Sequence, residues 1–500
     1  MELSLMLEMA AGDDPERVAV TNTDGSELTR EELLDDARSA ATTFDELGVD
    51  HVGYLDVNGM GLPIALFGAA IAHKPFVPFN YRLSDEQLTE LLHREPSLAL
   101  VASGATAERL RTLGIERIVD TATLHTSTSA PASDFVPGDP DDIAVLLYTS
   151  GTTSAPKAAV LRHRHLTSYV ISTVEFGAAG ADDAVLVSVP PYHIAGISTI
   201  LSNLYMGRRI VYLDPFDPHR WLATVKDQGI THAMVVPTML SRIVDATGGE
   251  APDIPTLRSL AYGGAPMPRP VIERALQLMP SVDFTNAYGL TETSSTITVL
   301  GPEDHRSAIA SDLPGVRNRL QSAGRAVPGV EIVVKTPEGD TCPPGVVGDV
   351  YVRGEQVSGE YLGAGSTVQD GWFPTKDRGW LDEEGFLFIE GRSDDTIIRG
   401  GENIAPAEIE DALLQHPAVA ECAVVGLPDE EWGHRIAAAV VLRADQDSTS
   451  TDDLRAWARE RLRSSKTPDL IAIRVELPYT DTGKLIRREI RSALAELEKQ

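Results

Sequence analysis

The segment TSGTTSAPK, residues 149–157, combines residue types that suit phosphate binding. It follows the apolar run IAVLLY, residues 143–148, and precedes a segment compatible with a helix. Small hydroxylated residues and an early glycine let a loop present hydroxyls and backbone N–H groups to phosphate oxygens, and Lys157 adds a positive charge. The loop is not of the GxxxxGK[ST] type, because Pro156 precedes the lysine and Ala158 follows it. A solvent turn would explain the Ser and Thr content but not this position, so we predict a nucleotide-binding loop.

The elements that must position this loop follow from apolar runs between helix-sized stretches. They are IAVLLY (143–148), AVLVSV (184–189), RIVYL (209–213), HAMVV (232–236), LRSLAY (257–262) and DFTNAY (283–288). Continuous β-rich runs of this length indicate buried parallel strands joined by crossover helices. Residues 29–94 have the same character, with a helix capped near Thr29 and then a strand. The fold class is therefore α/β, and we expect two α/β lobes.

The sequence pattern changes after about Gly324. Two alternating runs flank a PEGD turn within residues 330–354, and residues 379–392 repeat the pattern, which is typical of antiparallel hairpins. From residue 393 onward the order is strand, helix, strand, strand, helix and a final helix, which predicts a small α+β domain. We expect a large N-terminal domain, 1–392, made of the two α/β lobes plus a β-rich subdomain, and a C-terminal domain, 393–500.

Composition and charge exclude several classes of function. The formal net charge of −31 creates a field that repels phosphate backbones and anionic lipid, which argues against nucleic-acid or membrane-surface binding. The two cysteines, Cys342 and Cys422, lie far apart without a CxxC pattern, which excludes a disulfide framework and argues against a zinc site. The acidic first residues do not match a signal peptide, and no apolar run reaches about 18 residues. We therefore expect a cytoplasmic protein without a membrane span.

Seven segments, in order along essentially the whole chain, resemble signatures of the adenylate-forming superfamily, which comprises acyl-CoA synthetases, adenylation domains of peptide synthetases, and luciferases. They are TSGTTSAPK (149–157), PPYHIAG (190–196), AYGGAP (261–266), NAYGLTE (286–292), GDVYVRG (348–354), the segment 370–410, and TDTGKLIRREI (480–490). The resemblance implies an enzyme that uses ATP and Mg²⁺ to convert a small-molecule carboxylate into an acyl-AMP. Coenzyme A would then accept the acyl group as a thioester.

The resemblance assigns the ATP-binding residues. Those of the phosphate loop would be Thr149, Ser150, Gly151, Thr152, Thr153 and Lys157. Tyr288 would stack on adenine, with Asn286 and the backbone of Gly264 and Ala265 at the adenine edge, although an aromatic residue that ends a strand is more often part of a core. Asp377 would bind both ribose hydroxyls, since one carboxylate accepts two hydrogen bonds at once.

The resemblance also assigns four catalytic residues. Glu292 matches the position that holds Mg²⁺, and Thr291 matches one that contacts the α-phosphate. Attack on the α-phosphorus spreads charge over phosphate oxygens, which a hard cation held by one carboxylate neutralises. Arg392 would assist at the ribose and phosphate. Lys484 would orient the carboxylate against the α-phosphate, two anions that otherwise repel; a solvated lysine at a helix start is the alternative. Lysine is rare here, with eight among 43 basic residues, which makes one inside a motif informative.

The small domain is expected to be mobile, because residues assigned to different steps lie on it. By resemblance, Lys484 serves adenylation, whereas Gly400, Gly401 and Glu402 would line the channel for the phosphopantetheine arm of coenzyme A. A single pose is ill suited to both steps, so a few backbone torsions must absorb a rotation. Asp394 matches the hinge position of the family; an ordinary exposed turn acid is the alternative.

The predicted carboxylate pocket contains Tyr192, His193, Gly263 and Gly289. Amino-acid-activating members usually place an aspartate near the Tyr-His pair to bind the substrate ammonium, and this chain has His193 there. An unpaired ammonium in an apolar pocket would be costly, which favours a fatty acyl or aryl tail. His193 either gates an acyl tunnel or is a hydrogen-bonded wall residue, and both roles stay open. Gly263 and Gly264 leave little bulk in the expected pocket floor.

Two positions depart from the family pattern. Ser154 replaces a usual glycine in the phosphate loop, and Lys376 replaces the glycine that precedes Asp377. If such a residue needs a positive φ, a side chain there costs strain. Neither change removes a catalytic group, so the sequence predicts an active ATP-dependent acyl-CoA synthetase. The alternatives are an acyl-AMP ligase that loads an acyl carrier protein and a non-catalytic nucleotide-binding homologue.

Overall fold

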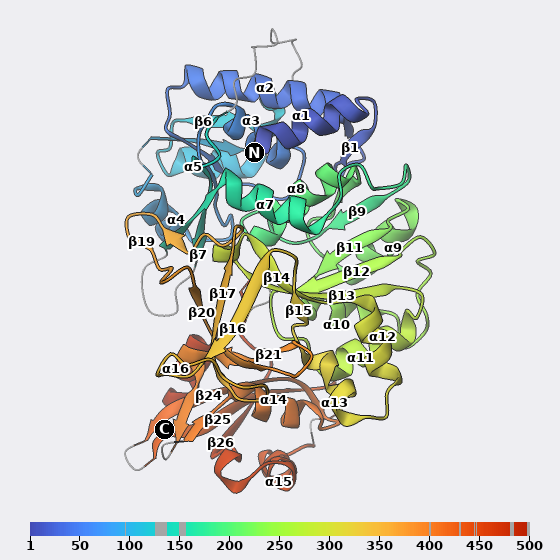
Figure 1. Ribbon diagram of the computed structural model, residues 1–500, viewed down its shortest axis with the longest axis vertical. Helices are drawn as coiled ribbons and strands as arrows, with labels where there is room; N and C mark the ends of the chain where they lie inside the picture. The colour runs from blue at the N-terminus through green and yellow to red at the C-terminus, as the bar shows by residue number, and fades with distance from the viewer. Residues whose placement is uncertain are drawn as a thin grey trace.

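The computed structural model describes residues 1–95, 97–125, 138–149, 157–399, 402–429, 432–444, 446, 448–480 and 485–497. It has a large N-terminal domain and a small C-terminal domain, as the sequence predicts (Figure 1). The described strands form four sheets, two of which belong to the α/β lobes. Among the described residues, no helix combines the length and the apolar character needed to cross a lipid bilayer.

The first lobe is built on a nine-stranded sheet whose central strands are parallel. In spatial order its strands are β15 (Arg325–Ala326), β14 (Ser295–Leu300), β13 (Asp283–Leu290), β12 (Ser259–Gly263), β11 (His232–Val235), β9 (Ala184–Val187), β10 (Arg209–Tyr212), β1 (Val18–Thr21) and β2 (Glu27–Thr29). The five apolar runs predicted as strands between residues 184 and 288 are all in this sheet. Strands β9 and β10 are buried nearly throughout, which explains their continuous apolar character, whereas β11, β12 and β13 include partly buried residues.

The second lobe contains an eight-stranded sheet. Its strands are β19 (Gly365–Ser366), β18 (Glu360–Tyr361), β8 (Lys157–Arg162), β7 (Ile143–Thr149), β4 (Phe76–Pro78), β3 (His51–Tyr54), β5 (Leu98–Ala102) and β6 (Ile118–Asp120). The prediction of a helix-compatible segment after the phosphate loop is wrong. That segment is β8, which pairs antiparallel with β7. Short apolar runs do not distinguish strand from helix, and here the pairing with β7 decides.

Helices fill the space between the two large sheets and cover their outer faces. The N-terminal domain contains α1 (Leu3–Asp13), α2 (Arg30–Glu46), α3 (Gly61–Ile71), α4 (Asp85–Leu92), α5 (Gly104–Thr112), α6 (Thr121–Leu124), α7 (His163–Thr173), α8 (Ile194–Met206), α9 (Pro218–Asp227), α10 (Pro237–Ala246), α11 (Arg269–Leu278), α12 (Pro302–Ala310) and α13 (Pro314–Arg317). Side chains of α1, α2, α3, α7 and α8 pack in one core with strands of both sheets. Helices α9 to α11 cover the other face of the first sheet, and α4 and α5 that of the second.

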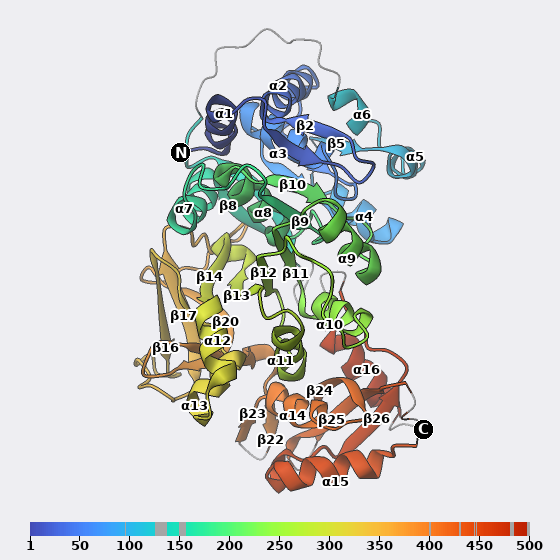
Figure 2. The same cartoon turned by 90° about the vertical axis from the view of Figure 1, so that its right-hand side faces the viewer.

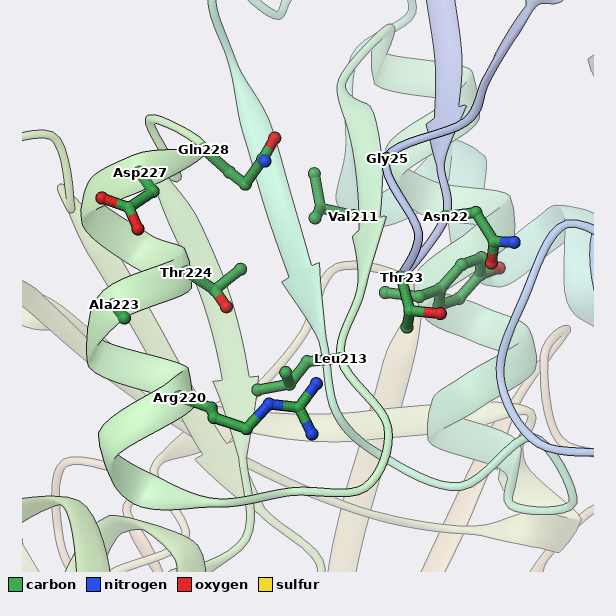
Figure 3. A pocket seen from close by; sticks show the side chains of 11 residues that line it. Asn22, Thr23, Gly25, Val211, Leu213, Arg220, Ala223, Thr224, Asp227 and Gln228 are labelled. Atoms are coloured by element: carbon green, nitrogen blue, oxygen red, sulfur yellow. The ribbon is translucent and has the colours of Figure 1, made fainter.

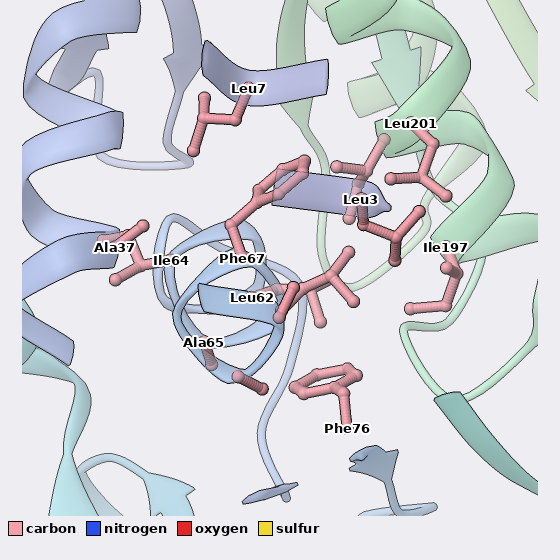
Figure 4. Packing of buried hydrophobic residues seen from close by; sticks show 14 of the residues in the cluster. Leu3, Leu7, Ala37, Leu62, Ile64, Ala65, Phe67, Phe76, Ile197 and Leu201 are labelled. Atoms are coloured by element: carbon pink, nitrogen blue, oxygen red, sulfur yellow. The ribbon is translucent and has the colours of Figure 1, made fainter. Parts of the chain in front are cut away.

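Helix α2 begins as the sequence predicts, because Thr29 and Glu32 form a capping box. Helix α1 was not predicted. Its residues Leu3 and Leu7 are fully buried, and they point toward Phe67 of α3 and Leu201 of α8 (Figure 4). The segment thus forms a helix whose apolar face lies in the central core.

The β-rich subdomain is a four-stranded antiparallel sheet, β16 (Val330–Lys335), β17 (Gly348–Gly354), β20 (Phe373–Leu381) and β21 (Leu387–Arg392), as both predicted hairpins require. The C-terminal sheet contains β22 (Ile397–Arg399), β23 (Glu402–Ile404), β24 (Val419–Asp429), β25 (Gly433–Leu442) and β26 (Leu470–Arg474). Strand β26 was not predicted; it pairs parallel with β25.

Three helices sandwich the C-terminal sheet (Figure 2). They are α14 (Pro406–Leu414), α15 (Thr451–Arg461) and α16 (Arg487–Leu497). Helices α14 and α15 share one core beneath the sheet, and α16 packs in a separate core on the other face. The structure also contains short 3₁₀ helices, which are η1 (Thr291–Thr293), η2 (Asn318–Gln321), η3 (Ser393–Asp395) and η4 (Ser464–Lys466).

Candidate active site

Three predicted nucleotide residues meet around one carboxylate. The Tyr288 hydroxyl donates a hydrogen bond of 2.5 Å to Oδ2 of Asp377, and Nη1 of Arg392 lies 3.3 Å from Oδ1. Asp377 is 5% exposed. Burial and the neighbouring Asp377 carboxylate raise the pKa of Tyr288 well above its ordinary value, so its phenol stays a donor. The structure therefore brings together a carboxylate, an aromatic ring and a guanidinium from three different strands.

A bulge in β20 directs Asp377 into this cluster. The register between β17 and β20 shifts between Asp349 and Tyr351, and Lys376 adopts a φ of +63°. The Asp377 N–H donates to Oγ1 of Thr375 at 3.1 Å, which fixes the turn. Glycine adopts a left-handed φ without a Cβ penalty, whereas another residue pays about 1–2 kcal/mol. The positive φ thus explains why glycine is usual here, and Lys376 keeps the geometry despite its side chain.

Glu292 lies in η1, directly after β13, and is 9% exposed. Its Oε1 accepts a hydrogen bond of 2.5 Å from the hydroxyl of Tyr361. Lys157 Nζ lies 5.8 Å from the centroid of the same ring. The two predicted phosphate-site residues, which come from β8 and η1, therefore meet at one tyrosine that the sequence analysis missed.

The donors around Glu292 fit Mg²⁺ better than a transition metal. Among the described residues, no three His, Cys, Asp or Glu side chains cluster as a metal site. Mg²⁺ typically binds through one or two carboxylates together with substrate phosphates, so a single carboxylate facing a nucleotide is a suitable protein ligand. Thr291 begins the same turn. Its contact with an α-phosphate stays a prediction.

The base of the predicted phosphate loop is a β-hairpin. Thr149 pairs with Lys157, and its hydroxyl donates to the Lys157 carbonyl at 3.3 Å. Just before it, the Tyr148 hydroxyl donates to Oε1 of Glu95 at 2.7 Å, and His51 Nδ1 lies 2.7 Å from Oε2. The remaining loop residues, Ser150, Gly151, Thr152, Thr153 and Ser154, lie outside the described residues, so their roles stay predictions.

His193 is the N-cap residue of α8. Its Nδ1 accepts a hydrogen bond of 3.3 Å from the Ala195 N–H, so the neutral ring carries its proton on Nε2. The preceding Tyr192 makes an edge-on ring contact with Tyr81 at a centroid distance of 5.8 Å. This geometry agrees with His193 as a hydrogen-bonded wall residue. A role of His193 in gating an acyl tunnel stays a prediction.

The glycines of the predicted pocket have a backbone explanation. A Cβ on Gly263 would lie 2.2 Å from the Ala287 carbonyl oxygen, and one on Gly289 would lie 1.8 Å from that of Ser295. Both positions therefore need glycine for strand packing, whatever the pocket requires. Gly264 has a φ of +84° and precedes Ala265 in the loop after β12. On β13, the side-chain amide of Asn286 donates to the Ser322 carbonyl at 3.0 Å.

The predicted residues of the small domain are only partly described. Glu402 begins β23, and its carboxylate accepts hydrogen bonds from Arg463 at 2.9 Å and Ser465 at 3.3 Å. The backbone of Asp394 lies in η3, between the last strand of the β-rich subdomain and β22. Its side chain, together with Gly400, Gly401 and Lys484, lies outside the described residues. The hinge, the channel and the catalytic lysine stay predictions.

A separate hollow lies away from these residues, beside the β1–β2 turn (Figure 3). Its volume is about 280 Å³, and α9 and β10 form two of its walls. Figure 3 shows Arg220 and Asp227 of α9 on one side and Asn22 and Thr23 on the other. None of the predicted site residues lines it. This hollow is therefore not the site that the motifs predict.

Comparison with known proteins identifies the family to which the chain belongs. The model of the family "AMP-binding enzyme" matches residues 7–362, and "AMP-binding enzyme C-terminal domain" matches residues 408–484. The chain is 34% identical over 486 residues to the fatty acid–acyl-carrier-protein ligase ScoC from Streptomyces coeruleorubidus, covering 94% of this chain and 92% of ScoC. It is 32% identical over 475 residues to a feruloyl-CoA synthase from Amycolatopsis, covering 93% and 94%.

A solved structure shares the fold over nearly the whole chain. O-succinylbenzoate-CoA synthetase from Bacillus subtilis, in complex with its acyl-adenylate intermediate, superposes with a TM-score of 0.84 at 28% identity, covering 97% of both chains. The same enzyme has been solved with ATP and a magnesium ion. These matches confirm the predicted fold and the predicted class of AMP-forming acid–thiol ligases. The chain therefore belongs to the AMP-binding enzyme family, the adenylate-forming superfamily that its motifs resemble.

Proposed function

We propose that this chain activates an aryl or fatty acyl carboxylate with ATP and Mg²⁺ and transfers the acyl group to coenzyme A. The observation that carries the proposal is that two buried carboxylates, both at positions predicted to contact the nucleotide or its metal, each accept a hydrogen bond from a tyrosine. Glu292 bonds Tyr361, and Asp377 bonds Tyr288 beside Arg392. One carboxylate suits a metal and the other suits a ribose.

In the first step, a carboxylate oxygen of the substrate forms a bond to the α-phosphorus of ATP. The bond from that phosphorus to the bridging oxygen breaks, and pyrophosphate leaves with the electron pair. Bound Mg²⁺ supplies positive charge to the phosphate oxygens. Asp377 holds the ribose, Tyr288 stacks on the adenine, and Lys157 and Thr291 contact phosphate oxygens. Lys484 lowers the repulsion between the two anions as they meet.

In the second step, the thiolate of coenzyme A attacks the acyl carbon, and AMP leaves. Glu402 and the two glycines before it form part of the channel for the phosphopantetheine arm. Since Lys484 and this channel belong to one small domain, the domain turns about Asp394 between the steps.

An aryl tail is the first choice of substrate. The edge-on contact between Tyr192 and Tyr81 offers a surface on which an aromatic ring can pack. Two similar proteins are named for feruloyl and succinylbenzoyl substrates, and both of these acyl groups contain an aromatic ring. His193 occupies the position where amino-acid-activating members carry an aspartate, and its Nδ1 is already engaged by the Ala195 N–H. The site therefore lacks, at this position, the anion that an amino acid would need.

ATP–pyrophosphate exchange with a carboxylate panel tests the proposal. Cinnamates, benzoates, fatty acids of several lengths and amino acids are compared, with Glu292→Gln as the inactive control. We expect exchange with cinnamates or benzoates above that with amino acids. Exchange highest with an amino acid, or equal in Glu292→Gln, would contradict the assignment.

A carrier protein is the second candidate acceptor, because ScoC, at 34% identity, ligates fatty acids to an acyl carrier protein. Both acceptors present the same phosphopantetheine thiol, so the channel does not separate them. Thioester formation with free coenzyme A and with a phosphopantetheinylated carrier protein, measured on the best carboxylate, decides between them. We expect free coenzyme A to be used.

A further inference from the structure

Tyr361 lies on a short strand that pairs with β8, and its partner there is two residues beyond Lys157. It belongs to β18, which pairs antiparallel with β8, and it lies opposite Ala159. The next residue continues the ladder, since Leu362 N–H donates to the Ala158 carbonyl at 2.9 Å. The position of the Tyr361 ring is thus coupled to the strand that follows the phosphate loop.

The residues just before Tyr361 are fixed to the other side of the nucleotide site. The N–H groups of Ser358 and Gly359 both donate to the Glu292 carbonyl oxygen, at 2.8 and 3.2 Å. The Ser358 hydroxyl donates to the Val160 carbonyl of β8. Residues 358–362, here called the bridging segment, therefore connect η1 to β8 through backbone hydrogen bonds.

The side chain of Tyr361 repeats this connection. Its hydroxyl donates to Oε1 of Glu292 at 2.5 Å, and its ring lies beside the Lys157 ammonium, 5.8 Å from the centroid. A phenol hydroxyl donates one proton, so this hydrogen bond leaves the second oxygen of Glu292 without that donor.

We propose that Tyr361 is a positioning residue for the metal: its hydroxyl orients the Glu292 carboxylate so that Glu292 binds Mg²⁺ carried by ATP. The inference rests on the proposed function, in which Glu292 is the protein ligand of Mg²⁺. Hydrogen bonds that orient metal ligands typically change metal affinity or activity by about 10- to 100-fold when they are removed. The aromatic ring has a second role, which is to hold Lys157 near the phosphates.

The experiment measures how much Mg²⁺ tightens ATP binding, without any carboxylate and therefore without turnover. Calorimetry gives the ATP Kd with saturating Mg²⁺ and with EDTA, and the ratio of the two values isolates the metal contribution. For Tyr361→Phe, which keeps the ring and removes the hydroxyl, we expect this ratio to fall by about tenfold relative to the wild type. The Kd measured in EDTA should stay within about twofold of the wild-type value.

Tyr351→Phe is the matched control. Tyr351, on β17, also has a lysine ammonium at its ring, with Lys335 Nζ 4.8 Å from the centroid, and no residue of the nucleotide site is involved. It should keep the wild-type ratio. Tyr361→Leu, which also removes the ring, should weaken ATP binding in EDTA as well. Urea midpoints of all variants establish that the fold is retained.

The outcomes separate this inference from the proposed function. If the wild-type protein fails to bind ATP, the proposed function and the role of Tyr361 are both overturned. If wild type binds ATP more tightly with Mg²⁺ and Glu292→Gln loses that gain, while Tyr361→Phe keeps it, only the role of Tyr361 is overturned. Equal loss of ATP affinity with and without Mg²⁺ in Tyr361→Phe also overturns it, since that pattern indicates a general packing defect. In pyrophosphate exchange, Tyr361→Phe should need about tenfold more Mg²⁺ for half-maximal rate.

Discussion

The carboxylates of the nucleotide site and those of the joint between the domains have different surroundings. In the site, Glu292 and Asp377 each accept a hydrogen bond from a tyrosine, and Asp377 also faces an arginine. At the joint, α14 packs against β21, and Glu408 of α14 forms an ion pair with Lys466. Burial there raises the pKa of Glu390; Arg378 and Lys466 oppose the shift, and Glu408 adds to it.

The difference indicates what each region is built to do. Donors around the site carboxylates fix their orientation, which catalysis needs before ATP arrives. The joint carries charged groups of both signs, and polar interfaces between domains permit relative motion. A preorganised nucleotide site next to a polar joint fits the proposed enzyme, whose two steps need different domain poses.

The largest expected effect is the loss of acyl-AMP formation, the first step, when Lys484 is replaced. Lys484→Ala should slow acyl-AMP formation by about 100- to 1,000-fold, because it removes the cation that reduces repulsion between carboxylate and phosphate. Thioester formation from supplied acyl-AMP should stay near the wild-type rate. Pyrophosphate exchange and acyl-AMP consumption with coenzyme A measure the two steps. Lys226→Ala, which removes an exposed lysine paired with Asp253, is the control.

Equal loss of both steps in Lys484→Ala would mean that the lysine is structural. It would also remove the main reason to expect that the small domain serves the two steps in different poses.

The next effect concerns the joint. Asp394→Pro should leave pyrophosphate exchange measurable while thioester output falls by about tenfold or more, because proline fixes φ near −65° and constrains the residue before it. Asp394→Ala removes the same carboxylate without that constraint and should retain both steps. Parallel loss in the two assays, in proportion to lost stability, would identify Asp394 as an ordinary turn residue.

A smaller effect is expected within the rigid site. Asp377→Ala should raise the ATP KM by about tenfold, since two ribose hydrogen bonds are lost and each is worth about 0.5–1.5 kcal/mol. Tyr288→Phe, which removes only the hydroxyl that donates to Asp377, should change the ATP KM less. Initial rates at several ATP concentrations check both variants. An unchanged KM in Asp377→Ala would contradict the ribose assignment.

The comparison of the two regions also shows which features the sequence predicts. Strands β9 to β13 follow from their apolar runs; the signal is continuous in β9 and β10, where nearly every residue is buried, and persists in β11 to β13 beside partly buried residues. Strand β8 was misread because a short apolar run takes its structure from its partner, here β7. Strand β26 carries the short apolar run LIAI, which the sequence analysis did not assign to a strand, and in the structure it pairs parallel with β25.

The site shows the same limit at the level of single residues. Glu292 and Asp377 were found because they lie within motifs, whereas Tyr361 lies in the short strand β18 and acts through a contact with a residue 69 positions away. Gly263 and Gly289 were predicted as residues of the carboxylate pocket, yet neighbouring backbone oxygens already require glycine there. A signal for Tyr361 did exist, since it is an aromatic residue between two glycines of GEYLG, but only the fold gives it a partner.

The smallest expected effect tests the joint between the domains through the pH dependence of the protein's stability. Gln321 of the N-terminal domain donates a hydrogen bond of 3.0 Å to Asp411 of α14. Burial, with a contribution from Glu410, raises the pKa of Asp411 from 3.8 to about 6, although Gln321 and Arg269 act to lower it. A raised carboxyl pKa means that the folded, docked form binds the proton more tightly, so its stability is greatest below the usual pKa and falls as the pH rises through about 6. Asp411→Asn removes this penalty and should stabilise the protein at pH 8 by roughly 1 kcal/mol, allowing for partial exposure, and by about half as much at pH 5, which lies between the usual pKa and the raised one. Urea midpoints at both pH values measure the effect, with the exposed turn residue substitution Asp340→Asn as a control of equal charge change. A gain at pH 8 that is the same at pH 5, or is matched by the control, would show that the joint carries no such charge penalty.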